Sequence, residues 1–502
     1  LRVSLAGTLE GLDAPAQRVV SLTPYLLGST RRDFSIPKTT TDADVGGDFK
    51  YGVTQSLTLD LTYNTDFAQV EVDDQQVNLT RFSVFFPEKR TFFLENAGTF
   101  AVGTPETAEL FFSRRIGIGP GGSTVPLLGG ARLSGKSGGT TLGFLNIQAR
   151  ERDDIDPQNY GVVRVMRELP NRSRIGGVLV SRFNTDSTGD RNLTYGLDSR
   201  LGLGDRILVD GYAALTDTPG LKGNQYAWSL GASYTDRNWE GGVAVRDLAE
   251  NFNPEVGFLV RDSYYFLTAR VLRHVRTPSI SWLRELRPHV TFWEYRGRDW
   301  FVENRLVHID NHVEFANGAF FQLPGINFTT DGLQQPFEIA EGVVIPAGTY
   351  HNWYWGFAYN TDLSAPLSVQ GRLDIGGLYS GSRVAAYGTV NGRWGPMVGS
   401  VRYSWNDVKL PEGDFVRKLV GLKLAYSFTP RIYLQGLAQY SNESRAFQGN
   451  LRLGWLTAAG TGLYVVYNDA ELDGDGTDGE APGWRPQERA LIIKFTKLFD
   501  LR

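Results

Sequence analysis

The chain contains no cysteine among its 502 residues, and this absence removes several classes of chemistry. Without thiols there can be no disulfide framework, no thiol nucleophile, and no thiolate ligand for zinc or an iron–sulfur cluster. Long hydrophobic runs are missing too, since no stretch approaches the roughly 18 unbroken apolar residues of a membrane-spanning helix. The sequence therefore excludes a helical membrane protein.

An excess of positive charge is also missing. The 51 Lys and Arg residues are outnumbered by 55 Asp and Glu residues, the formal net charge is −4, and the isoelectric point is about 5.9. We therefore expect no nucleic-acid partner held by a basic surface. No phosphate-binding or dinucleotide-binding glycine loop is present, so we expect no cofactor. Residues 1–5 lack the basic start and apolar core of a targeting signal.

The pattern that is present is alternation of apolar and polar residues. In residues 56–64 the leucines share one face with a tyrosine, and the polar residues share the other face; residues 367–375 repeat this pattern. A period of two predicts strands, whereas helices need apolar residues three and four apart. The segments are about 9–13 residues long, which is near the 9–11 residues that a tilted strand needs to cross a bilayer.

Between residue 17 and the C-terminus we find about 22–26 such segments, separated by connectors that are mostly short and long in turn. Two long connectors lie at 329–349 and 470–487, on the same side of the predicted barrel. A soluble β-sandwich or propeller is the alternative, but soluble sheets have shorter strands and bury their apolar face. Aromatic residues near the segment ends resemble the interfacial girdle of a membrane barrel: Tyr63, Trp228, Tyr403, Trp405, Tyr426, Phe428, Tyr440, Trp455 and Phe495.

The sequence thus predicts an all-β fold, a closed antiparallel transmembrane β-barrel in a bacterial outer membrane, formed by residues 17–502 as one domain in contact with outer-membrane lipid. In this arrangement the polar face of each strand lines the lumen. The residues that we expect to set the polarity of the lumen are Asp60, Arg372, Asp374, Arg402 and Arg452.

Residues 66–117 do not alternate. They are dense in aromatic and charged residues, and Pro87 is incompatible with a central strand. The charges cannot face lipid, because an Arg or Lys at the bilayer midplane costs about 2–4 kcal/mol. We predict that this segment folds inward as a plug or constriction, the alternative being a periplasmic turn or an external loop packed on itself. The predicted charge network consists of Glu71, Asp73, Asp74, Arg81, Glu88, Lys89, Arg90, Glu95, Arg114 and Arg115.

Two strings in this segment, QQVNLTRFSVFFPEKRTFFLENAGTF (75–100) and LFFSRRIG (110–117), resemble the signature of an uncharacterised family of bacterial outer-membrane barrels. Members of that family usually follow a family-9-type carbohydrate-binding module. The resemblance implies an outer-membrane location and a missing upstream region, of which residues 1–16 are the lead. It does not imply that these 502 residues themselves bind carbohydrate.

Metal-ligand candidates are few. His308, Asp310, His312 and Glu314 share one face of a predicted strand, but a rise of about 3.4 Å per residue separates His308 from His312 by about 13 Å. Since that is too far to share an ion directly and no third ligand is visible, we interpret this strand as polar rather than metal-binding. A Gly-rich connector offers carboxylates that could hold calcium, although a solvated acidic loop is the favoured interpretation: Asp473, Asp475, Asp478 and Glu480.

These features predict a porin-like channel or transporter for polar solutes, possible glycans included, with a partly occluded lumen. A first alternative is a non-transporting envelope anchor for a carbohydrate-binding domain or for a periplasmic or surface partner protein. A second alternative is a glycan hydrolase that uses Glu88 and Glu95 as its paired carboxylates. No nucleophile elbow of the G-x-S-x-G type accompanies them, and we expect no enzymatic activity.

Overall fold

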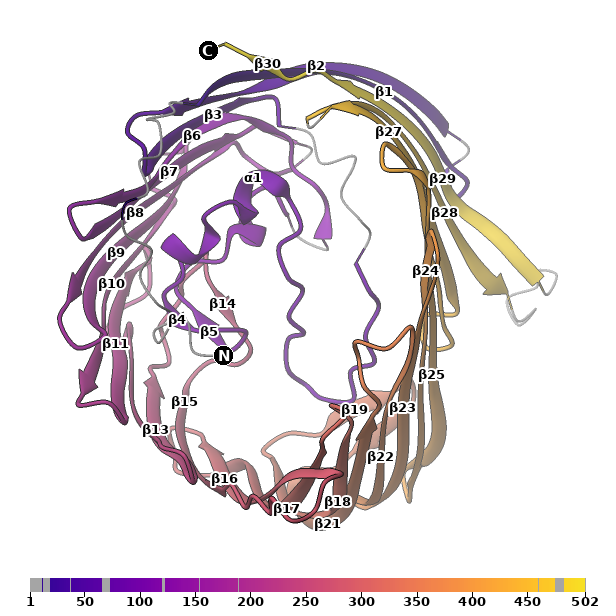
Figure 1. Cartoon of the computed structure of the whole chain (residues 1–502). Helices are drawn as coiled ribbons and strands as arrows, with labels where there is room; N and C mark the ends of the chain where they lie inside the picture. The colour runs from indigo at the N-terminus through magenta and orange to yellow at the C-terminus, as the bar shows by residue number, and fades with distance from the viewer. Residues whose placement is uncertain are drawn as a thin grey trace.

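The computed structural model describes residues 11, 19–36, 38–65, 73–119, 122–152, 154–187, 189–458, 460–474 and 483–501. Within this part of the chain, 24 strands form one closed antiparallel barrel (Figure 1), as predicted. The barrel strands are β1 (Val20–Asp33), β2 (Lys38–Gly52), β3 (Leu57–Tyr63), β6 (Leu127–Ser137), β7 (Thr140–Ala149), β8 (Gln158–Leu169), β9 (Ser173–Asn184), β10 (Arg191–Leu203), β11 (Ile207–Asp217), β12 (Tyr226–Thr235), β13 (Trp239–Leu248), β15 (Tyr264–Arg273), β16 (Leu283–Arg296), β17 (Val302–Phe315), β18 (Phe320–Leu333), β21 (Gly348–Asn360), β22 (Leu367–Leu378), β23 (Gly381–Trp394), β24 (Met397–Leu410), β25 (Gly413–Thr429), β26 (Ile432–Ser441), β27 (Ala446–Ala458), β28 (Thr461–Gly474) and β29 (Gly483–Thr496).

The barrel closes between its first and last long strands. β1 pairs with β2 along its whole length and also with β29, from Tyr25 opposite Thr496 to Asp33 opposite Glu488. The short β30 (Phe499–Asp500) pairs with the start of β1. Every other barrel strand pairs with its neighbours in chain order. Closure leaves the barrel without a free sheet edge, which a membrane requires because peptide groups in hydrocarbon cannot bond to water.

The outer surface of the barrel is apolar. Along β22, Leu367 and Ile375 are 57% and 40% exposed, whereas Ser368 between them is 2% exposed and faces inward. The same alternation holds on β24, where Val401 and Tyr403 are exposed. Such a band on a closed barrel matches hydrocarbon and is incompatible with a soluble sandwich. The chain is therefore an outer-membrane β-barrel. No helix in the described part of the chain has the length and hydropathy of a membrane-spanning helix.

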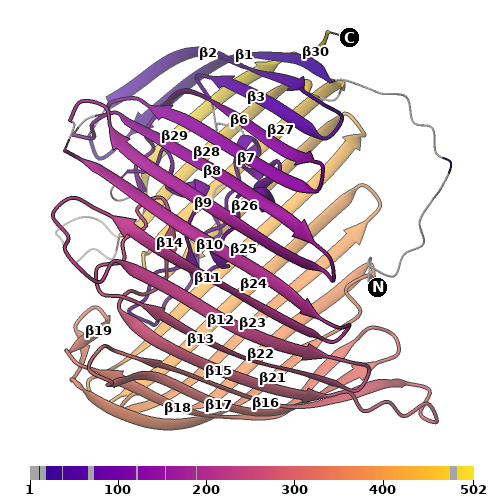
Figure 2. The same cartoon turned by 90° about the vertical axis from the view of Figure 1, so that its left-hand side faces the viewer.

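The two ends of the barrel differ in their connectors (Figure 2). One end, which we call the turn end, has short connectors such as 138–139, 170–172 and 395–396. The other, the loop end, has 249–263 and the long connector 64–126 between β3 and β6. Outer-membrane barrels keep short turns in the periplasm and longer loops outside. We therefore infer that the connector 64–126 enters the lumen from the external side.

The predicted connector 329–349 is largely strand. β18 continues to Leu333, and a small hairpin of β19 (Phe337–Ala340) and β20 (Val343–Ile345) precedes β21. The hairpin forms because its apolar side chains are buried in a cluster with Leu79, Leu333 and Val408. Strands β28 and β29 likewise extend to Gly474 and from Gly483, into the predicted connector 470–487.

Candidate functional site

The site is built by the inner part of the connector 64–126, which we call the luminal segment (residues 73–119 and 122–126). It lies inside the barrel (Figure 1), so the predicted inward folding of the non-alternating segment is confirmed for its described residues 73–117. It contains little regular structure, and its β5 pairs with β14 (Phe258–Leu259) of the connector 249–263. Its short elements are α1 (Thr91–Leu94), η2 (Ala97–Thr99), β4 (Gly103–Thr104), β5 (Ala108–Glu109) and η3 (Ser113–Arg115).

Aromatic and aliphatic side chains anchor the luminal segment to one half of the wall. Phe93 and Phe100 are buried, and Ile116 is fully buried. Burying such side chains stabilises the packing by about 1.5–3 kcal/mol each. The wall residues of this cluster are apolar and belong to strands between β6 and β15: Leu127, Leu145, Ile147, Ala149, Tyr160, Val162, Val178, Val180, Tyr212, Ala214, Ala227, Leu248 and Tyr264. The luminal segment therefore occupies this half of the lumen.

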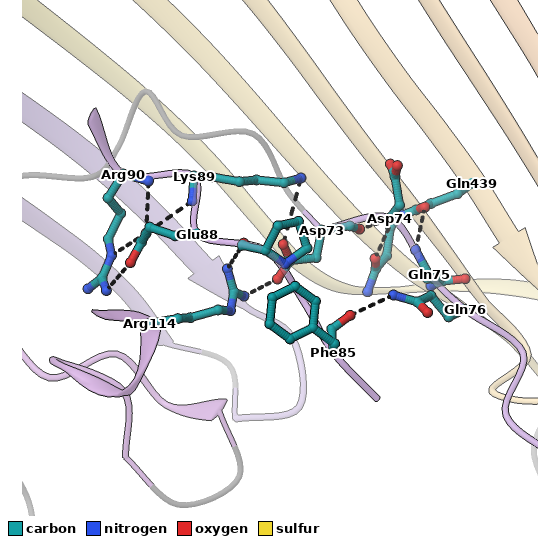
Figure 3. Close-up of polar contacts among 12 residues, drawn as sticks. Asp73, Asp74, Gln75, Gln76, Phe85, Glu88, Lys89, Arg90, Arg114 and Gln439 are labelled. Carbon is teal, nitrogen blue, oxygen red and sulfur yellow. Dashed lines mark hydrogen bonds and ion pairs between the residues drawn. The ribbon is translucent and has the colours of Figure 1, made fainter. Parts of the chain in front are cut away.

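A buried ion pair fixes the internal shape of the segment. Glu88 accepts hydrogen bonds from the Arg90 guanidinium at 2.6 and 2.8 Å, from the Arg90 backbone N–H at 2.9 Å and from the Ser113 hydroxyl at 2.8 Å. Arg90 also donates to the carbonyls of Ser113 and Ile116, both at 2.6 Å. Burial raises the pKa of Glu88, but the bonds and charge of Arg90 outweigh it, and the pKa is lowered. We call this the Glu88–Arg90 clasp (Figure 3).

A second network joins the segment to three wall strands. Arg132 of β6 is 2% exposed and donates to Asp60 of β3 at 2.7 Å. The same guanidinium donates to the Glu95 carboxylate at 3.2 Å and to the Glu95 carbonyl at 2.8 Å. Lys50 of β2 pairs with Asp60 at 3.5 Å and also with Glu95. Burial raises the pKa of Glu95, but Lys50 and Arg132 outweigh it and lower the pKa.

Residues 73–80, which we call the arm, reach the opposite wall (Figure 3). Asp74 forms an ion pair with Lys423 of β25 at 2.8 Å and lies 3.9 Å from Arg402 of β24. The Gln75 N–H donates to the Gln439 side chain of β26 at 3.0 Å. Burial raises the pKa of Asp74, but Lys423 and Arg402 outweigh it and lower the pKa. Asp73 is held from within the segment by Lys89, at 3.6 Å, and by Arg114.

A cavity of about 560 Å³ lies between the arm and the wall at β22–β24. Its lining includes aromatic surface from Phe86 and Tyr387. The charged residues that line it are four cations and three anions: Lys89, Arg372, Arg383 and Arg402, and Asp73, Asp74 and Asp374. The arm therefore leaves space along this half of the lumen, while most of the luminal segment packs against the other half.

The remaining predicted site residues lie apart from the arm's ion pairs. Arg81 and Arg115 donate to the carbonyls of Gly332 and Gly257 at 3.1 and 3.2 Å. Arg452 hydrogen-bonds Gln435. Arg372 pairs with Asp374 at 2.9 Å within β22. Of the calcium candidates, Asp473 lies in β28 opposite Trp484. Glu71, Asp475, Asp478, Glu480 and most of the predicted lead 1–16 lie outside the described residues.

Sequence reasoning missed the wall residues that hold the segment, namely Lys50, Arg132, Lys423 and Gln439. Their signal was available, since each occupies the polar face of an alternating strand, as Asp60 and Arg402 do. Their partners are far away in the sequence, however, and alternation assigns a face rather than a partner.

The side chains of His308 and His312 converge on one oxygen of Asp310, at 3.4 and 3.2 Å, although the two residues are separated along the strand. His289 from the neighbouring strand β16 lies beside them, and nothing in the sequence indicated this neighbour. That His308 and His312 do not share an ion directly stays a prediction. The estimate of about 13 Å compared backbone positions along one strand and ignored the reach of two imidazoles. Glu314 is not part of this group and pairs with Arg287 at 3.1 Å.

The chain is similar to one protein family and to solved structures of other barrels. A family described as a domain of unknown function (DUF5916) matches residues 15–131. No curated protein is significantly similar to the chain. Among solved structures, OccAB3 of Acinetobacter baumannii is 11% identical, with 96% of this chain and 99% of that chain covered and a TM-score of 0.29. The siderophore receptor PirA of Pseudomonas aeruginosa is 9% identical, with 95% and 80% covered and a TM-score of 0.44.

Proposed function

We propose that the protein is a porin-like channel or transporter for polar solutes. The observation that supports this most directly is the uneven filling of the lumen. The luminal segment packs against the half at β6–β15, while the arm leaves a cavity of about 560 Å³ bordered by charged side chains at β22–β24. A solute that passes the constriction travels between the arm and this wall.

The charges of the cavity indicate which solutes it favours. Four cationic and three acidic side chains line it, so the constriction has a small excess of positive charge. Opposite charges on the arm and the wall suit polar solutes with separated dipoles, and hydroxyl-rich molecules such as glycans can also hydrogen-bond there. We therefore expect a weak preference for anions.

The test is electrical recording from the purified protein in planar bilayers under a salt gradient. We expect the reversal potential to show weak anion preference. Arg402→Gln should move it toward cations and Asp74→Asn should move it further toward anions, because each change removes one charge from the cavity lining. Arg206→Gln, in an exposed connector at the turn end, is the matched control and should leave the potential unchanged. Equal potentials in all four proteins would contradict the proposal.

The envelope-anchor role stays a prediction, as does its link to a family-9-type carbohydrate-binding module, which rests on the resemblance of residues 75–100 and 110–117. A barrel that conducts no ions, even after Asp74→Ala with Gln439→Ala removes two polar contacts of the arm with the wall, would favour it. The hydrolase alternative receives no support from the described residues, because Glu88 and Glu95 are each engaged by cations in separate networks.

A further inference from the structure

A group of three histidines and one aspartate lies on the wall of the barrel at β16 and β17, away from the arm. His289 of β16 is in register with Asp310 of β17. On its other side, β17 has an irregularity against β18 between Ile309 and His312, so Asp310 has no partner there. The Asp310 side chain is fully buried, and those of His308 and His312 are 17% and 23% exposed.

The donor atoms of these residues point toward one another. The Nε2 atoms of His308 and His312 lie 3.4 and 3.2 Å from the same Asp310 oxygen, Oδ2. The Nε2 atoms of His289 and His308 are 3.1 Å apart. One ligand atom each from His289, Asp310 and His312 can be chosen so that all lie within 4.8 Å of one another.

Hydrogen bonds on the far side of two rings determine their tautomers. His289 Nδ1 lies 3.1 Å from the carbonyl oxygen of Arg287, which can only accept, so Nδ1 carries the proton. His308 Nδ1 lies 2.8 Å from Asn327 Oδ1. The Nδ2 group of Asn327 donates to the carbonyls of Gly325 and Tyr354, and this fixes the orientation of the amide. Asn327 Oδ1 therefore accepts the hydrogen bond from His308 Nδ1, which carries the proton.

In the neutral rings both Nε2 atoms therefore present lone pairs, and these face each other at 3.1 Å. Two acceptors repel at that distance unless a cation lies between them. One proton can bridge only two acceptors. Here, nitrogen atoms of three histidine rings and one oxygen of the fully buried Asp310 carboxylate lie close together. That set matches a metal ion, and ligands on a tetrahedral zinc ion lie about 3.3 Å from one another.

We propose that His289, Asp310 and His312 bind one divalent transition-metal ion beside His308, with Zn²⁺ as the best match. Imidazole nitrogen with carboxylate oxygen is a ligand set for zinc and its neighbours, while Ca²⁺ and Mg²⁺ prefer oxygen ligands alone. The bond from His289 to a carbonyl is one that orients metal-bound histidines. The ion would join β16 to β17 and stabilise this part of the wall.

The experiment uses the full chain without a histidine tag, purified in detergent, treated with a chelator and then dialysed. Titration with Co²⁺ alone should give one bound ion per chain and the visible absorption of four-coordinate Co²⁺, and added Zn²⁺ should displace it. His289→Gln and Asp310→Asn should each weaken binding at least about tenfold. The matched control is His351→Gln, since His351 bonds Thr330 outside the cluster and its loss should leave binding unchanged.

Two results would overturn the proposal. One is wild-type protein that binds Co²⁺ only weakly, without the four-coordinate spectrum, which would indicate a proton shared between His289 and His308. The other is binding that survives both cluster substitutions or is lost in His351→Gln. Heat-modifiable migration on a gel shows whether each variant is folded, and His312→Gln, at the most exposed ligand, provides a second variant should His289→Gln not fold.

Discussion

At the scale of single residues, Arg132 is the side chain that joins the wall to the luminal segment most directly. Arg132→Ala would leave Asp60 buried without its guanidinium partner, and breaking a buried ion pair in this way costs about 3–5 kcal/mol. We expect a lower midpoint in urea unfolding followed by the heat-modifiable gel shift. Arg31→Ala removes an exposed pair with Glu488 and should change the midpoint little. Equal effects of the two substitutions would show that the Arg132 network does not support the fold.

Glu88 gives the luminal segment a specific pH dependence. Its pKa in the folded protein is below the ordinary value of 4.5, so the clasp contributes stability that is fully present above 4.5 and is lost as pH falls through the lowered value. We expect limited proteolysis within the segment to stay constant from neutral pH down to about 4.5 and to increase only below it. Glu88→Gln should be cleaved faster than the wild type at neutral pH, and the difference should disappear at the lowest pH, where Glu88 is itself uncharged. A wild-type increase that begins near pH 6 would contradict this assignment.

At the scale of elements, the strands could be predicted because apolar residues that face lipid alternate with polar residues that face the lumen, and this alternation is visible within each strand. Regions where both faces are apolar were harder to interpret. On β7, Phe144 faces outward while Leu145 is buried under the luminal segment, and Val162 and Val180 of β8 and β9 are buried in the same way. The short apolar runs at these places were the available signal. The partners of the arm were not predictable, since Asp74 and Lys423 are far apart in the sequence.

The luminal segment itself is tested by removal. Deleting residues 85–100 takes away Glu88, Phe93 and Phe100, which are the clasp and part of the apolar anchor. We expect a larger single-channel conductance in planar bilayers because the filled half of the lumen opens. The double variant Asp74→Ala with Gln439→Ala, which only weakens the polar contacts of the arm with the wall, should give a smaller increase. Unchanged conductance after the deletion would show that this segment does not restrict passage.

At the scale of the whole molecule, the outer surface must match hydrocarbon. Leu422 of β25 is 45% exposed on the lipid side, and Leu422→Arg would place a charge there at a cost of about 2–4 kcal/mol near the midplane. We expect a smaller folded fraction after refolding into detergent or lipid, measured by the heat-modifiable gel shift. Ser404→Arg, on the cavity side of β24, is the matched control and should fold normally. A loss of folding in the control alone would contradict the assigned faces.

The pairing of β1 with β29 has a consequence for biogenesis. Until β29 is added, β1 lacks one neighbouring strand and β28 lacks another. The incomplete sheet therefore has two edges with unpaired backbone N–H and C=O groups. Neither edge can be exposed to the hydrocarbon core of the bilayer, where its peptide groups would have no hydrogen-bond partners. The insertion machinery must therefore protect both edges until β29 pairs with β1 and the barrel closes. A chain truncated before β29 would keep both edges unpaired and could not close.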